Sequence, residues 1–134
     1  MGKKSLVIGH SMTTAMENSG QFLMKELEKK GVALSAAMWF FYGEMFSWKY
    51  ILVINDFEER GPTFVYSLIN QINRDNRSNK YHSIPLESIE AKGKSAFIYK
   101  MMKGAFSIEN SKVRFSNSMV NGLDVVDCLI YKFK

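Results

Sequence analysis

Two short clusters of charged residues have types and spacing that could support metal-assisted chemistry. Asp56-Phe57-Glu58-Glu59-Arg60 follows an apolar run directly, and Glu90-Ala91-Lys92 lies further along the chain. Carboxylates at the end of a strand can bind Mg²⁺, a hard cation that takes oxygen ligands. Nucleases of the restriction-enzyme type combine an acidic residue with a Glu-x-Lys triplet on a strand, and the lysine there can act on the attacking water or the scissile phosphate.

One hypothesis is therefore a metal-dependent phosphodiesterase. Its catalytic residues would be Asp56, Glu58, Glu59, Glu90 and Lys92, with Asp56 and Glu90 as the ligands of Mg²⁺. The expected topology argues against it, because such nucleases place both motifs on adjacent strands, whereas a whole helix is expected between the two clusters. The simpler interpretation is that the first cluster stabilises the N-terminus of the following helix through the helix dipole.

Aromatic side chains are concentrated between residues 39 and 50, where Trp39, Tyr42 and Trp48 are candidate binding residues. Unpaired nucleic-acid bases stack on aromatic side chains of a sheet. Aromatic residues also anchor protein–protein interfaces. Lys49 is the only basic residue of this segment, and burial of a central hairpin on both faces explains the aromatic residues more simply.

The positive charge of the chain is confined to its second half. Residues 1–67 hold seven Lys/Arg and seven Asp/Glu, whereas residues 68–134 hold eleven Lys/Arg and six Asp/Glu, which accounts for the net charge of +5. Clustered cations attract phosphate groups, although lysines also keep the edge of a sheet from pairing. The basic candidates for binding are Arg74, Arg77, Lys80, Lys92 and Lys94.

The elements that must position these residues are predicted from local patterns. Thr14 and Glu17 have the spacing of a capping box at the start of a helix, Pro62 suits the first position of another, and Asn121-Gly122 is typical of a two-residue hairpin turn. The predicted order is helix, hairpin, helix, edge strand, helix, hairpin. The corresponding ranges are 14–30, 33–56, 62–72, 81–91, 95–103 and 113–133.

This order predicts a single α+β domain over residues 1–134. We expect a largely antiparallel sheet of about five strands, made of two hairpins and an edge strand, with three helices packed mainly on one face. The strand 48–56 is apolar on both faces in its middle, which indicates a position inside the sheet. Pro85 confines the segment 81–91 to an edge.

Composition excludes several classes of protein. The chain has 134 residues, 46% of them hydrophobic and 23% charged, as in an ordinary globular domain. It has no apolar run of the roughly 18–20 residues that a membrane-spanning helix needs. The apolar stretch 5–8 is too short for the core of a signal peptide, and the single cysteine, Cys128, cannot form a disulfide within the chain. We therefore expect a cytoplasmic protein that does not associate with membranes.

Four segments together resemble a family of small bacterial proteins without an assigned activity. The resemblance would extend over nearly the whole chain and implies a shared fold, but it includes no chemical motif and so implies no catalytic residue. The segments are Ala37-Met38-Trp39, the strand from Trp48 to Ile54, Gly61-Pro62-Thr63-Phe64-Val65-Tyr66 and Asp127-Cys128-Leu129-Ile130-Tyr131.

The leading hypothesis is a non-catalytic interaction module of the bacterial cytoplasm that binds a protein partner or a nucleic acid and needs no cofactor. It depends on the aromatic hairpin, the one-sided charge and the lack of a convergent catalytic set in the sequence. The alternative is the Mg²⁺-dependent phosphodiesterase. Strand order, self-association and the identity of the partner stay open at this point.

Overall fold

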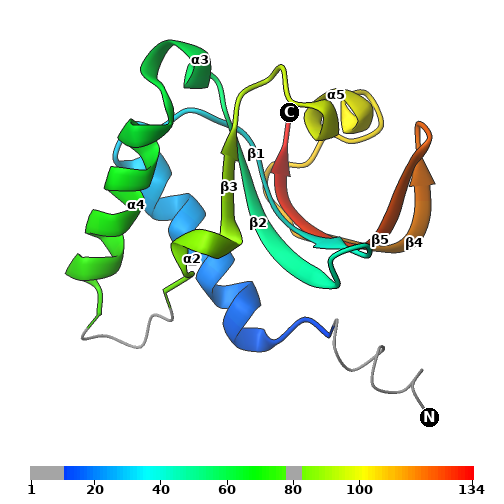
Figure 1. Cartoon of the computed structure of the whole chain (residues 1–134), viewed down its shortest axis with the longest axis horizontal. Helices are drawn as coiled ribbons and strands as arrows, with labels where there is room; N and C mark the ends of the chain where they lie inside the picture. The colour runs from blue at the N-terminus through cyan, green and yellow to red at the C-terminus, as the bar shows by residue number, and fades with distance from the viewer. Residues whose placement is uncertain (1–10, 78–82) are drawn as a thin grey trace.

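The computed structural model describes residues 11–77 and 83–134 and contains one five-stranded sheet with helices on both sides (Figure 1). The elements are α2 (Thr14–Lys29), β1 (Leu34–Tyr42), β2 (Ser47–Ile54), α3 (Phe57–Arg60), α4 (Pro62–Asp75), the 3₁₀ turn η1 (Leu86–Ser88), β3 (Ile89–Lys92), α5 (Phe97–Met102), β4 (Val113–Val120) and β5 (Leu123–Phe133).

The strands are arranged in the order β3-β2-β1-β5-β4, with β1 at the centre. β1 pairs antiparallel with β2 and with β5, and β4 pairs antiparallel with β5. The hairpin β4–β5 turns at Asn121 and Gly122, whose φ angles of 51° and 86° fit the predicted two-residue turn. β3 pairs parallel with β2, because the chain crosses over through α3 and α4 before it returns to the sheet.

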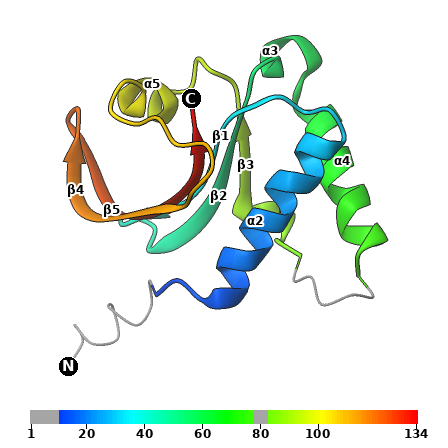
Figure 2. The same ribbon diagram turned by 180° about the vertical axis from the view of Figure 1, so that it is seen from behind.

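The predicted α+β class is confirmed, and so is the interior position of β2. The two long helices, α2 and α4, pack on one face of the sheet, whereas the short α5 lies on the other face (Figures 1 and 2). The strands β4 and β5 curl toward α5, so this second face is concave (Figure 2). Within the described residues, no helix combines the length and the apolar character needed to cross a membrane.

Hydrogen bonds from the polar atoms of aromatic side chains to the backbone of α2 hold this helix against the sheet. The Trp39 indole N–H donates to the Met16 carbonyl at 2.9 Å, and the Tyr50 and Tyr131 hydroxyls donate to the carbonyls of Gly20 and Glu17 at 2.6 and 2.7 Å. Each ring is buried while its polar atom has a partner, as buried tyrosine and tryptophan require. The apolar residues that fill the core on this face include Leu23, Leu27, Leu52, Val65, Ile69 and Ile72.

The concave face has its own core, formed where alternate residues of the strands point toward α5. Met38, Ile51 and Cys128 are fully buried there against Met102. Other members of this core are Ala36, Phe40, Val53, Ile98, Tyr99, Ile130 and Phe133. Both faces of the central strands are therefore covered, which explains why their sequences are apolar almost throughout.

Several boundaries differ from the prediction. The cap of α2 is Thr13, whose Oγ1 accepts from the Met16 backbone N–H at 3.0 Å, so the predicted capping box is one residue late. Among its described residues, the predicted edge segment contains the 3₁₀ turn η1 and only the first three residues of β3, which ends one residue later at Lys92, because Pro85 and the polar residues around it do not extend the strand. Residues 81 and 82 of that segment lie outside the described residues.

Candidate binding groove

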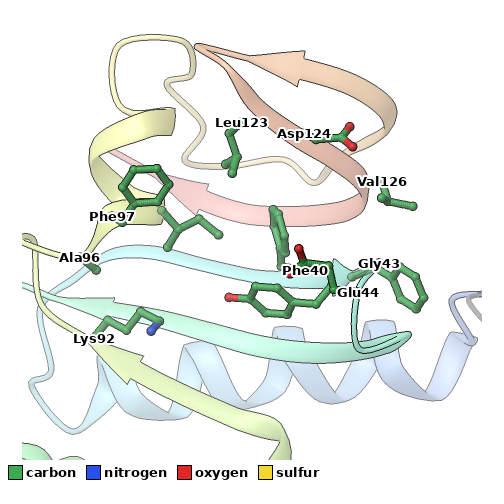
Figure 3. Close-up of a pocket in the computed structure, with 12 residues that line it drawn as sticks. Phe40, Gly43, Glu44, Lys92, Ala96, Phe97, Leu123, Asp124 and Val126 are labelled. Carbon is green, nitrogen blue, oxygen red and sulfur yellow. The ribbon is translucent and has the colours of Figure 1, made fainter.

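A groove of about 670 Å³ opens on the concave face, between the end of the hairpin β1–β2, the N-terminal end of α5 and the start of β5 (Figure 3). Its size falls in the range of ligand sites in proteins. Its walls come from segments far apart in the chain, so the fold as a whole forms it. The lining residues are Phe40, Phe41, Tyr42, Gly43, Glu44, Lys92, Ala96, Phe97, Ile98, Leu123, Asp124 and Val126.

The wall of the groove is mostly apolar. Phe40 of β1 and Ile98 of α5 are buried, and Leu123 of β5 is half-buried. Phe97, the first residue of α5, is 67% exposed at the side of the groove, and Figure 3 shows it beside the space into which Phe40 and Leu123 point. A bulky apolar side chain is thus presented to solvent next to an apolar depression.

One end of the groove carries a small polar network. The Tyr42 hydroxyl donates to Glu90 Oε1 at 3.1 Å, and Lys92 Nζ lies 3.7 Å from the same oxygen. Burial, together with the charge of Glu90, raises the pKa of Tyr42 well above its usual value. The phenol therefore stays protonated and keeps donating to Glu90. Glu90 lies opposite Ile51 in the β2–β3 register, which places it on the concave face.

Two acidic side chains lie at the rim of the groove and are exposed to solvent. Glu44 belongs to the turn between β1 and β2, and Asp124 is the second residue of β5. The two segments are neighbours, because a Cβ at Gly43 would stand 3.1 Å from Val126 Cγ2. Neither acid forms an ion pair with any other described residue. Their charges are available to a ligand.

The acidic residues of the phosphodiesterase hypothesis have different partners in the structure. Asp56 faces Arg60 at 3.4 Å, Glu58 accepts from Ser95 Oγ at 2.8 Å, and Glu59 is exposed on α3. Glu90 engages Tyr42 and Lys92 as described above. Each of these carboxylates except Glu59 therefore has its own partner.

The two strands of that hypothesis are nevertheless adjacent. The expectation that the intervening helix would separate them was wrong, because the crossover returns β3 to the side of β2. The register still keeps the proposed metal ligands apart. Glu90 pairs with Ile51, which lies about 10 Å along the strand from its last residue, Ile54, and Asp56 follows beyond that end.

The described residues include no group of three or more His, Cys, Asp or Glu side chains that could hold a metal ion. Asp56 and Glu90, the two predicted ligands of Mg²⁺, do not converge on one point. The geometry of the described chain thus gives no support to the metal-dependent phosphodiesterase.

The three aromatic candidates have different environments. Trp39 is only 4% exposed and is bonded to α2, so it is a core residue and the proposal that it contacts a partner was wrong. Trp48 is partly buried and packs against Phe41, with 5.3 Å between ring centroids. Tyr42 lines the groove. Of the three, only Tyr42 contributes to the site described here.

The basic candidates do not form one patch. Arg74 lies in the last turn of α4 and Arg77 follows that helix, whereas Lys92 ends β3 and Lys94 lies beyond it. α4 runs antiparallel to β3, so the two pairs lie toward opposite ends of that strand (Figure 1). Lys80 lies outside the described residues.

Sequence reasoning missed most of the groove. Phe97 was not among the candidate residues; the buried residues of α5 are Ile98, Tyr99 and Met102, and Phe97 is exposed. Six residues are too few for a periodic pattern to establish which side is buried. Glu44 and Asp124 carried no signal at all, because each lies in or beside a turn where acidic residues are ordinary.

Comparisons with protein families, with curated proteins and with solved structures give no match for this chain. The resemblance to a family of small bacterial proteins accordingly stays a prediction.

Proposed function

We propose that the chain is a non-catalytic interaction module of the bacterial cytoplasm, and that it binds a protein partner through the groove on its concave face. The observation that carries this proposal is Phe97, two-thirds exposed beside an apolar depression. Exposed aromatic side chains beside apolar pockets are typical anchors of protein interfaces. Burial of Phe97 by a partner would remove its apolar surface from water.

A nucleic acid fits this groove less well. Its rim carries the unpaired acids Glu44 and Asp124, which would repel a phosphate backbone. The one lysine of the lining, Lys92, already lies beside Glu90. A binding surface for single strands combines stacked aromatic residues with a continuous basic track, and the described basic candidates are divided between two ends of β3.

An enclosed small molecule also fits less well than a protein segment. Sites for small ligands bury 70–90% or more of the ligand surface. Here one wall is the exposed Phe97, and the rim residues Glu44 and Asp124 are exposed as well. A partner whose own surface covers the open side would complete the enclosure.

The test compares matched baits in an extract of the producing organism. Wild-type protein, Phe97→Ala and Met119→Ala serve as baits, and retained proteins and nucleic acids are quantified. Met119 is the control because it is a bulky apolar residue with 68% exposure, close to that of Phe97, but it lies on β4 and does not line the groove. Neither substitution removes a buried side chain, so both variants should fold.

We expect a protein that the wild type and Met119→Ala retain, and whose retention falls at least about tenfold with Phe97→Ala, as for an aromatic residue that dominates an interface. Equal retention of proteins by the wild type and by Phe97→Ala, or retention of nucleic acid alone, would contradict the proposal.

A further inference from the structure

We infer that the segment accepted by the groove is cationic and amphipathic: an apolar side chain enters between Phe40, Leu123 and Phe97, and flanking Lys or Arg side chains reach Glu44 and Asp124. This inference rests on the proposed function and specifies the chemistry of its partner. It follows from the net charge of the groove, which is negative, whereas the net charge of the whole chain is positive.

The charge balance of the groove is negative. Its lining contributes Glu44, Asp124 and Lys92, and Glu90 lies 3.7 Å from Lys92. Three carboxylates and one ammonium group give a local net charge of −2, in a chain whose net charge is +5. The groove would therefore attract a basic segment.

The arrangement of these groups also matches an amphipathic segment. The two unpaired acids come from different segments. Glu44 belongs to the turn after β1, and Asp124 lies at the start of β5, where it pairs with Met119 on the side of the strand opposite Leu123. The apolar side chains of the lining lie next to them, and Figure 3 shows Phe40 and Leu123 pointing into the space between these strands. A segment with a central apolar residue and basic neighbours can satisfy both kinds of surface at once.

Aromatic rings would add to the attraction for a cation. A Lys or Arg side chain over the face of a Tyr or Phe ring gains electrostatic energy from the ring quadrupole. The groove presents Phe97 and Tyr42, and the protonated Tyr42 hydroxyl is already directed at Glu90. A carboxylate-bearing segment would gain nothing from these rings and would meet the rim acids with like charge.

The experiment uses three capped, fluorescein-labelled peptides that share a central Leu-Phe pair and differ only in their four flanking residues, which are Lys, Gln or Glu. Binding to the full chain is measured by fluorescence anisotropy. The variants are Phe97→Ala, the double variant Glu44→Gln/Asp124→Asn, and Glu59→Gln as a control for an exposed acid outside the groove. The double variant replaces exposed groups with isosteric amides, so it should fold.

We expect the Lys peptide to bind about three- to tenfold more tightly than the Gln peptide, the range given by two exposed charge pairs, and the Glu peptide to bind most weakly. The double variant should remove this preference, Glu59→Gln should keep it, and added salt should reduce it. Phe97→Ala should weaken the Lys and Gln peptides alike.

Failure of the inference can be told from failure of the proposed function. Equal binding of the Lys and Gln peptides, both sensitive to Phe97→Ala, would overturn the cationic segment and leave the groove as a binding site. The inference would be overturned if the groove variants bound the Lys peptide with the same affinity as the wild type. It would also be overturned if no peptide bound. A dimer in sedimentation that Phe97→Ala converts to a monomer would identify a second copy of the chain as the occupant instead, and would also overturn it.

Discussion

Cys128 lies in the middle of β5 with its side chain fully buried on the concave face. Burial, with a smaller contribution from the nearby charge of Asp127, raises the pKa of this thiol to about 12. The thiol is therefore protonated at neutral pH and behaves as a small apolar residue of the core.

This raised pKa makes the stability of the protein depend on pH in alkaline solution. Between pH 9, where the thiol ionises in the unfolded chain, and pH 12, the folded state keeps a proton that the unfolded state loses. The free energy of unfolding should then fall as pH rises, by up to about 1.4 kcal/mol per pH unit. Below pH 9 both states hold the proton, and this contribution to stability is fully present.

Urea unfolding at pH 8.5, 9.0, 9.5 and 10.0 would measure this slope, with Cys128→Ala as the reference. The variant removes the thiol, and its cavity lowers stability by an amount that does not depend on pH. The wild type should lose stability more steeply than the variant. Above pH 10, Tyr42 and Tyr131 should add the same slope to both proteins, because burial raises the pKa of each. Equal slopes between pH 9 and 10 would contradict the burial of an un-ionised thiol.

The contact between α2 and the sheet depends on a glycine where the two approach closely. A Cβ at Gly20 would overlap the Tyr131 hydroxyl and would stand 2.8 Å from Trp39 Nε1. These two groups hold the helix through bonds to the Glu17 and Met16 carbonyls. A side chain at this position would therefore force α2 away from the rings that hold it.

Gly20→Ala should destabilise the fold by about 1–3 kcal/mol, the usual cost of overpacking. The direction is informative, because the same substitution in an unconstrained helix is stabilising by about 0.5–1 kcal/mol. Asn18→Ala, on the exposed side of the same helix, is the control and should leave stability unchanged or slightly higher. Chemical unfolding followed by circular dichroism measures the free energy of unfolding of each variant. A Gly20→Ala protein as stable as the wild type would show that α2 does not approach the sheet this closely.

Local sequence signals were sufficient for elements that carry their own pattern. Asn121-Gly122 predicts a hairpin turn because both residues adopt positive φ, and Pro62 predicts the start of α4 because its ring suits the first helical turn. The side of the sheet on which α5 packs, and the return of β3 to the side of β2, depend on contacts between distant segments. The groove depends on both, so no spacing within the sequence predicts it.

The two cores share the same strands. Trp39 and Leu52 point toward α2 and α4, whereas Met38 and Ile51 point toward α5. Loss of either core would expose one side of β1 and β2 to water. We therefore expect a single cooperative unfolding transition, as in most domains of this size. The binding groove would then be as stable as the fold that supports it.

Two intrinsic probes report on the two faces separately. The only tryptophans, Trp39 and Trp48, belong to or pack against the core beneath α2, and the only cysteine, Cys128, belongs to the core beneath α5. Tryptophan fluorescence and the fraction of thiol that reacts with a chromogenic disulfide in a short pulse should give the same urea midpoint. Met102→Ala leaves a cavity in the α5 core and should lower the free energy of unfolding by about 2–5 kcal/mol. Both urea midpoints should then fall together. If the thiol reacted at lower urea than the fluorescence change, the concave face would unfold on its own, and a partner in the groove would then have to supply the free energy of ordering it.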